Sequence, residues 1–182
     1  IDQNILSSIV SKAEINKKVN VIEIGPGIGS LTEHLLENAN HVISYEIDNS
    51  LIPILTKEFA DYDNFTLLNK DILKANIKED IKTYFKDDLP VYVVANLPYV
   101  DEDWDWLNKE SLSYEPRIAL YAKDHGLALI KELVRQTAEK QIKYLVLESD
   151  PCQHQEIIHG MLQHVILKQM DTAYQQKQKG IG

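Results

Sequence analysis

The sequence predicts an α/β fold: a mostly parallel sheet with helices on both faces. Short apolar segments typical of buried strands alternate along the chain with segments that carry helical apolar spacing. The first of these strands, which begins at Val21, runs directly into a glycine-rich turn and a helix. The chain has 182 residues, of which 44% are hydrophobic and 26% charged, so it is long enough for one domain with a full core.

The expected elements follow from that alternation. After the first strand, further strands are expected at residues 41–46, 65–69, 91–95, 142–148 and 165–170. Helices are expected at residues 4–13, 30–38, 51–60, 77–85, 127–141 and 151–163. Residues 100–126 lack clear periodicity and follow the fourth strand, where substrate loops lie in open α/β folds. The polar tail from Thr172 is expected to fray.

The glycine-rich turn indicates a cofactor site. Gly25, Gly27 and Gly29 alternate with other residues, which suits positive φ angles and close approach of a ligand, whose space side chains there would fill. The G-x-G-x-G spacing, with the acid Glu23 two residues earlier, is typical of S-adenosylmethionine sites rather than dinucleotide sites. Ser30 to Glu33 has the form of a capping box, so we expect a helix to start at Ser30 with its N–H groups facing the pocket.

Further strand ends carry the polar groups that such a cofactor needs. Glu46, followed by Ile47, ends the second strand, where a carboxylate can accept hydrogen bonds from both ribose hydroxyls. Taken alone, Glu46 fits an ordinary strand-end charge equally well. Asp71 follows the third strand and is placed to accept from an adenine amino group. The predicted site for S-adenosylmethionine, with S-adenosylhomocysteine as product, comprises Glu23, Gly25, Gly27, Gly29, Glu46, Ile47, Asp71, Ile72 and Asn96.

Composition limits the remaining possibilities. The sequence has no apolar run near the roughly 18 residues of a membrane span and does not begin like a secretory signal, so we expect a cytoplasmic protein with no membrane partner. The net charge of −9 opposes unaided binding to a phosphate backbone. Cys152 has no second cysteine to pair with. His154, His159 and His164 do not align on one helix face, and we expect no metal site.

Two family resemblances divide the chain. Residues 1–99 resemble the ribosomal RNA adenine dimethylases through Glu23-Ile-Gly-Pro-Gly-Ile-Gly-Ser-Leu-Thr, Tyr45-Glu-Ile-Asp48, Asn69-Lys-Asp-Ile-Leu73 and Ala95-Asn-Leu-Pro-Tyr99. Residues 100–182 resemble the release-factor glutamine N5-methyltransferases through Tyr114-Glu-Pro-Arg-Ile-Ala-Leu120, Asp124-His-Gly-Leu127, and Leu147-Glu148 followed by Gln153. Both resemblances imply a Rossmann-like S-adenosylmethionine-dependent methyltransferase fold. They divide its single domain into a cofactor-binding half, residues 1–99, and a substrate-side half, residues 100–182.

The resemblance also implies roles at the end of the fourth strand. The Asn96 side-chain oxygen and the Leu97 backbone carbonyl would accept hydrogen bonds from the nitrogen that receives the methyl group. Pro98 would fix the turn, and Tyr99 would pack on the planar acceptor group. The predicted catalytic residues are therefore Asn96, Leu97, Pro98 and Tyr99.

The change of resemblance leaves the acceptor open. The dimethylases carry a C-terminal helical domain and a segment before the position of Ile1, the glutamine enzymes carry an N-terminal helical bundle, and none of these occurs in the sequence. We interpret the chain as a chimera joined between Asn96 and Val100, and predict different relatives for its two halves. Three functions follow: methylation of RNA adenine N6, methylation of a release-factor glutamine, or a folded scaffold with little turnover.

Overall fold

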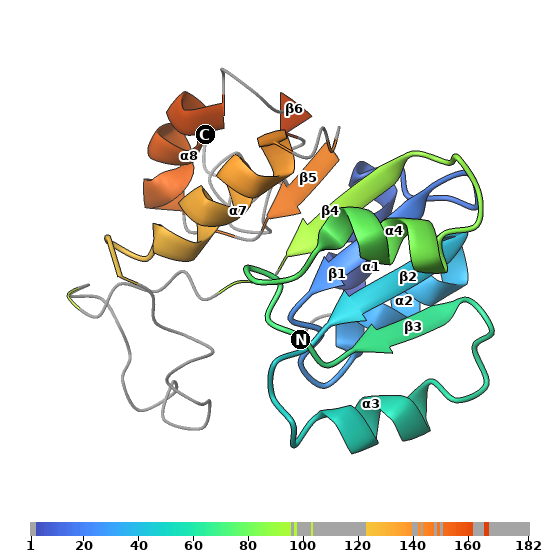
Figure 1. The fold of residues 1–182 in the computed structure, drawn as a ribbon. Helices are drawn as coiled ribbons and strands as arrows, with labels where there is room; N and C mark the ends of the chain where they lie inside the picture. The colour runs from blue at the N-terminus through green and yellow to red at the C-terminus, as the bar shows by residue number, and fades with distance from the viewer. Residues whose placement is uncertain are drawn as a thin grey trace.

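The structure is a computed structural model that describes residues 3–95, 97, 103, 123–139, 142, 144–147, 149, 151–161 and 166–167. These residues form one six-stranded sheet with strand order β3-β2-β1-β4-β5-β6, and every pairing in it is parallel. Accordingly, the arrowheads of β1 to β5 point to the same side in Figure 1. The strands are β1 (Asn20–Ile24), β2 (His41–Tyr45), β3 (Phe65–Leu68), β4 (Val91–Ala95), β5 (Tyr144–Leu147) and β6 (Ile166–Leu167).

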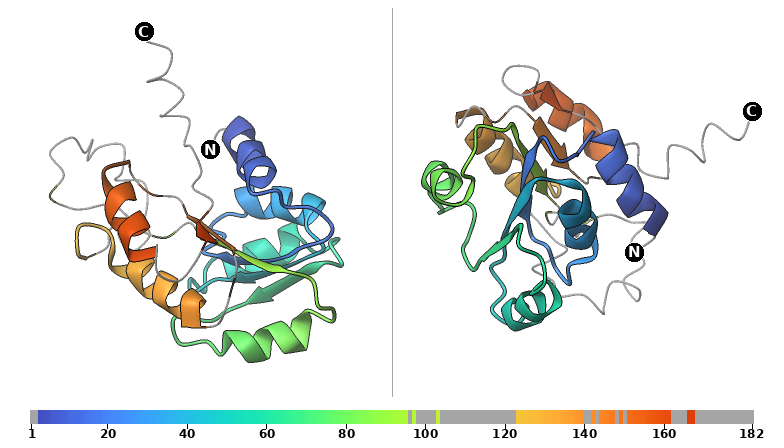
Figure 2. Two further views of the ribbon diagram at one scale, coloured as in Figure 1. Left: turned by 90° about the horizontal axis from the view of Figure 1, so that it is seen from above. Right: turned by 90° about the vertical axis from the view of Figure 1, so that its right-hand side faces the viewer.

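Helices cover both faces of the sheet, as predicted. They are α1 (Gln3–Lys12), α2 (Ser30–Asn38), α3 (Ile52–Glu58), α4 (Ile77–Tyr84), α7 (Ala128–Glu139) and α8 (His154–Met161), the last preceded by a short 3-10 turn at Pro151–Gln153. In Figure 2, right, α4 and α7 lie on one side of the strands and α1 and α2 on the other. The α/β fold is therefore confirmed, and the strands are mostly apolar because both of their faces are buried.

Alternating residues of each strand point into two cores. One core packs Ile22, Ile43 and Val93 of the central strands against α4 and α7. The other packs Val21, Val42 and Val94 against α1, α2 and α3. Glu23 and Ser44 extend the second row toward the carboxyl ends of β1 and β2, which places two polar side chains beneath the glycine-rich turn.

The predicted capping box at α2 is wrong, although the helix does begin at Ser30. Gly29 occupies the N-cap position with φ 91°, and no side chain caps the helix there. A residue in the left-handed region suits glycine, so the N-cap moves one residue earlier and Ser30 becomes the first helical residue. A reciprocal cap occurs instead at α4, where the Asn76 side chain accepts from the Glu79 amide at 3.4 Å and donates to the Glu79 carboxylate at 3.2 Å.

A buried amide network holds the start of β1. Asn20, which is fully buried, donates from Nδ2 to Asp87 Oδ1 at 2.7 Å and accepts at Oδ1 from Asn40 at 2.8 Å. Asn40 also donates to Asp87 Oδ2 at 3.0 Å, and the Leu89 amide donates to Asp87 Oδ1 at 3.0 Å. The start of β1 is thus tied to the turn before β2 and to the loop before β4.

The elements after β4 match the expected order with shorter bounds. The helix predicted at residues 127–141 is α7, the strand predicted at 142–148 is β5, and the last strand is the short β6. Most of the aperiodic segment at residues 100–126 lies outside the described residues, as does the tail from Thr172. Among the described residues, no helix is long and apolar enough to cross a membrane.

Candidate functional site

The glycine-rich turn joins the carboxyl end of β1 to α2. Gly25, Gly27 and Gly29 have φ angles of 70°, 59° and 91°, so all three adopt the positive φ that the spacing predicts. The Gly25 amide donates to the Tyr45 carbonyl at 3.0 Å, which holds the turn against the end of β2. A Cβ placed on Gly27 would have no heavy atom within 4 Å, so this part of the turn faces open space where a ligand can approach.

Gly29 has a different reason to be glycine. A Cβ there would lie 2.6 Å from Phe59 Cε2 and 3.2 Å from Leu55 Cδ2. The expectation that a side chain at this position would fill the space of the ligand is therefore wrong for Gly29, because the space belongs to the aromatic ring that follows α3. Only the positive φ angle was foreseen.

Glu23 is buried under the turn with one oxygen occupied. Its Oε2 accepts hydrogen bonds from Ser44 Oγ at 2.6 Å and Thr32 Oγ1 at 2.8 Å. No described residue donates to Oε1. Burial raises the pKa of Glu23 to about 7, against the lowering effect of the two hydroxyl donors. A buried acid with an open acceptor oxygen is suited to bind a cation or an N–H donor.

The two hydroxyls that hold Glu23 were not predicted from the sequence. Ser44 is the register partner of Glu23 in the neighbouring strand, and Thr32 lies in the first turn of α2. Both side chains are fully buried. The available signal was Ser44 itself, a polar residue between Ile43 and Tyr45 within a predicted buried strand.

Glu46 lies directly after β2, as predicted. It is 5% exposed, and its Oε1 accepts from the Asp48 amide at 2.8 Å. Within the described part of the chain, its other oxygen accepts no hydrogen bond. Ile47, next to Glu46, is 62% exposed, and Ile28, in the glycine turn, is 71% exposed. Exposed isoleucines beside a half-occupied carboxylate can cover the apolar faces of a bound nucleoside.

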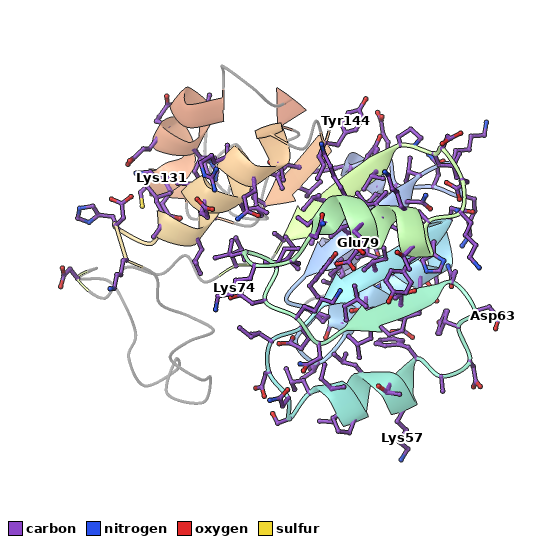
Figure 3. The ribbon with its side chains drawn as sticks, viewed as in Figure 1. Lys57, Asp63, Lys74, Glu79, Lys131 and Tyr144 are labelled. Atoms are coloured by element: carbon purple, nitrogen blue, oxygen red, sulfur yellow. The ribbon has the colours of Figure 1, made fainter. Side chains whose placement is uncertain are left out.

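Asp71 follows β3 on the loop that leads into α4. Its Oδ1 accepts from the Leu73 amide at 3.0 Å, and its Oδ2 lies 3.3 Å from the exposed Lys74 ammonium. Figure 3 labels Lys74 on this loop and Glu79 on α4 beyond it. Ile72 is 7% exposed and its side chain belongs to the core, so only its main chain is open to a ligand.

The loop that carries Asp71 is tied to the end of β2. Asn69 Nδ2 donates to the Glu46 carbonyl at 3.0 Å, and the Glu46 amide donates to the Leu68 carbonyl at 3.0 Å. The structure thus brings together Glu23, the glycine turn, Glu46 and the loop with Asp71 at the carboxyl ends of β1, β2 and β3. Ligands bind at this edge of open parallel sheets.

The predicted acceptor-binding residues are only partly described. Leu97 is half-buried and packs against the core that includes α4 and α7. Asn96, Pro98 and Tyr99 lie outside the described residues, so their roles stay predictions. The end of β4 at Ala95 lies beside the end of β1, since Ile24 and Ala95 are register partners. The carboxyl end of β4 therefore lies next to the start of the glycine turn.

Two motifs of the second half meet in space. Asp124, His125 and Gly126 have φ angles of 58°, 53° and 80°, a left-handed turn that immediately precedes α7. Gln153 Nε2 donates to the His125 carbonyl at 2.9 Å and holds this turn against the start of α8. Lys131 of α7, labelled in Figure 3, pairs with Asp124 at 2.7 Å and also with Glu156 at 2.5 Å.

Comparisons with known proteins identify the first part of the chain. A family model described as ribosomal RNA adenine dimethylase matches residues 1–102. The ribosomal RNA small subunit methyltransferase A of Streptococcus thermophilus is 57% identical over 98 residues, which cover 54% of this chain and 34% of the relative. The protein of the same name from Lactococcus lactis is 58% identical over 98 residues, 54% of this chain and 33% of the relative. The chain thus spans about a third of the length of these relatives.

A solved structure extends the fold comparison over more of the chain. The crystal structure of a predicted O-methyltransferase from Agrobacterium tumefaciens covers 88% of this chain and 66% of its own, with a TM-score of 0.53 and 18% sequence identity. This likeness concerns the fold, and it includes elements after residue 102. The family model matches more than half of the residues and contains β1 to β4 with the site described above. The chain therefore belongs to the ribosomal RNA adenine dimethylase family.

Proposed function

We propose that this chain contains the cofactor-binding core of an S-adenosylmethionine-dependent N-methyltransferase that acts on adenine N6 of RNA. The observation that carries the proposal is the set of open polar groups at one sheet edge: Glu23 Oε1 and the second oxygen of Glu46 accept nothing from the described residues. Family membership supplies the acceptor class, since the similar proteins from Streptococcus and Lactococcus are named as ribosomal RNA methyltransferases.

The residues present fit this cofactor. The open space at Gly27 allows a ligand to approach the backbone of the turn closely. Below the turn, Glu23 Oε1, which accepts nothing from the described residues, offers an acceptor for a cationic group of the ligand. Glu46 would accept from ribose hydroxyls, and Asp71 with the main chain of Ile72 would bind the edge of the adenine. When bound, the cofactor supplies an electrophilic methyl group on a sulfonium.

The acceptor side needs aim rather than a strong base. An aryl amine has a delocalised lone pair, and acceptors that bind its N–H groups favour the pyramidal form in which that pair can attack. We assign these acceptors to the Asn96 side chain and the Leu97 carbonyl, with Pro98 fixing the turn and Tyr99 packing on the base. Leu97, anchored in the core beside the end of β4, supports this placement of the segment.

Calorimetric titration with S-adenosylhomocysteine tests the cofactor site. One site with micromolar affinity is the expected result, and Gly27→Val is expected to abolish it, because the side chain would enter the open space. The matched control is Gly126→Val: it also places a side chain at a positive φ, 80°, but in the turn before α7. No binding by a folded wild-type chain would contradict the proposal.

Asn96→Ala tests the acceptor site. Loss of one placed hydrogen-bonding group is expected to lower turnover by about 10². The affinity for S-adenosylhomocysteine, measured by titration, is expected to survive, because the amide addresses the acceptor rather than the nucleoside. Turnover equal to that of the wild type would remove Asn96 from the mechanism.

Our second proposal is that residues 100–182 derive from a release-factor glutamine N5-methyltransferase and are joined to the first half as a chimera. The observations that favour it are the end of the family match at residue 102 and the contact between Gln153 and His125, which join two of the motifs that carry the resemblance. Incorporation of labelled methyl into ribosomal RNA, into a release factor, or into neither separates RNA methylation, glutamine methylation and an inactive scaffold. A single family matching the whole chain would contradict the chimera.

A further inference from the structure

A buried carboxylate beneath the site joins three elements. Asp80 of α4 is 6% exposed; its Oδ2 accepts from the Tyr45 hydroxyl at 2.9 Å and its Oδ1 from the Lys70 ammonium at 2.7 Å. Tyr45 is the last residue of β2, and Lys70 lies on the loop after β3. One side chain on a helix therefore binds the end of one strand and the loop that follows its neighbour.

Each partner of Asp80 precedes a residue of the candidate site. Tyr45 is followed by Glu46, the predicted ribose acceptor, and Lys70 is followed by Asp71, the predicted adenine acceptor. The loop has two more ties, from Asn69 Nδ2 to the Glu46 carbonyl at 3.0 Å and from Gln136 Nε2 of α7 to the Leu73 carbonyl at 3.2 Å. Of these ties, only the one through Asp80 acts directly on the residue next to Asp71.

In this network, Tyr45 is always the donor and Asp80 the acceptor. Burial and the adjacent Asp80 carboxylate raise the pKa of the Tyr45 hydroxyl far above its ordinary range, so that hydroxyl stays a donor. Lys70 is the exposed member, with 46% of its side chain accessible, while the Asp80 side chain is 9% accessible. Packing therefore fixes Tyr45 and Asp80, and the hydrogen bond to Asp80 fixes the position of Lys70.

We propose that Asp80 is a positioning residue that sets Asp71 relative to Glu46 and thereby makes the site selective for a 6-aminopurine nucleoside. The inference rests on the proposed function, because it assigns Asp71 to the adenine amino group. Asp80 itself does not touch the ligand. It acts through Lys70 on the neighbouring acceptor, so its loss should affect recognition of the purine edge more than binding of the rest of the nucleoside.

The test compares two ligands on the same proteins. S-adenosylhomocysteine carries the 6-amino group, and S-inosylhomocysteine carries an oxygen there, which would oppose the Asp71 carboxylate. The wild type is expected to prefer the first by at least about tenfold in Kd, the scale of one hydrogen bond made or opposed in a buried site. Asp80→Asn and Lys70→Met are expected to reduce this preference to about twofold to threefold.

Lys70→Met keeps the proposal testable if Asp80→Asn does not fold, since Lys70 is partly exposed. Asp87→Asn is the matched control, because it weakens a carboxylate network at the opposite end of the sheet and is expected to lower Tm without changing the preference. A wild type that discriminates while both site variants discriminate equally well would overturn the positioning role alone. A wild type that binds neither ligand would refute the proposed function, and this inference with it.

Discussion

The two ends of β1 both carry a buried polar network, and the networks differ in whether they are complete. At the start, both side-chain groups of Asn20 have partners, from Asp87 and Asn40. At the end, Glu23 has two donors on Oε2 and none from the described residues on Oε1. The first network stabilises the fold, whereas the second leaves one oxygen of a buried carboxyl group without a donor among the described residues, which is costly unless a ligand donates to it.

The contrast lies within one strand and concerns hydrogen bonding rather than burial. Both residues are equally hidden, Asn20 at 0% and Glu23 at 2% exposure, so burial alone does not distinguish them. What distinguishes Glu23 is its raised pKa and an oxygen that accepts no hydrogen bond from the described part of the chain. Four substitutions test the two ends of β1: one in the glycine turn that follows the strand, and three in the networks themselves.

Gly29→Ala is expected to have the largest effect on stability. The added Cβ would lie 2.6 Å from Phe59 Cε2, and the alanine would have to keep the φ angle of 91°. Overpacking and the left-handed backbone together should cost about 3 kcal/mol in the free energy of unfolding. Gly27→Ala is the control: with open space around its Cβ it should cost about 1 kcal/mol, for the backbone alone. Equal losses in denaturant titrations would show that the contact with Phe59 is unimportant.

Glu23→Gln should change how stability depends on pH. The pKa of Glu23 is raised from 4.5 to about 7 in the folded chain, so the stability contributed by its protonated form is complete below pH 4.5 and is lost as pH rises through 7. The loss amounts to about 3 kcal/mol for a shift of this size. The glutamine variant lacks this loss, so its stability relative to the wild type should increase between pH 4.5 and pH 8.

Urea denaturation of both chains across this pH range measures the difference. Glu58→Gln, at the exposed end of α3, makes the same chemical change outside the core and serves as the control. Parallel pH profiles of stability for the wild type and Glu23→Gln would mean that folding does not raise the pKa of Glu23.

Asp87→Ala addresses the complete network. It leaves the buried Asn20 amide and the Leu89 amide without their acceptor, which should cost about 2 kcal/mol. Because the network lies at the opposite end of the strand from the glycine turn, the Kd for S-adenosylhomocysteine should stay within about twofold of the wild-type value. A large loss of affinity in a variant that is still folded at the assay temperature would show that the network at Asn20 affects the ligand site at the other end of β1, and would contradict the proposed independence of the two.

Ser44→Ala should have the smallest effect. It removes the shorter of the two hydrogen bonds to Glu23, from a donor that lowers the pKa of that carboxyl. The expected cost is about 1 kcal/mol at pH 8, where Glu23 is ionised, and less at pH 5. Chemical denaturation at the two pH values measures it. A larger loss at pH 5 than at pH 8 would reverse the expected sign.

Local pattern was enough to predict the order of the helices and strands. Buried parallel strands read as unbroken apolar runs, so β4 was predicted with its observed bounds at Val91–Ala95, and α2 with its bounds at Ser30–Asn38. Glu23 was predicted from its position two residues before the first glycine, and Glu46 and Asp71 from their positions at or after the ends of apolar runs. Their meeting at one edge follows from the parallel arrangement of the strands.

Interactions between distant segments were beyond the sequence. Phe59 at Gly29, and Asp80 between Tyr45 and Lys70, depend on how α3 and α4 pack on the sheet, which no local spacing specifies. The capping box at Ser30 was wrong for a related reason. The tight turn required a left-handed Gly29 at the position that a side-chain cap would have needed.

The contact between Gly29 and the ring of Phe59 bears on the thermodynamics of ligand binding. The ring of Phe59 lies so close to Gly29 that an added Cβ would be 2.6 Å from it, so packing restrains the end of the turn. A turn already ordered loses little conformational entropy when a ligand arrives, so more of the contact energy remains as affinity. Binding at this edge of the sheet should therefore involve little loss of backbone conformational entropy in the turn.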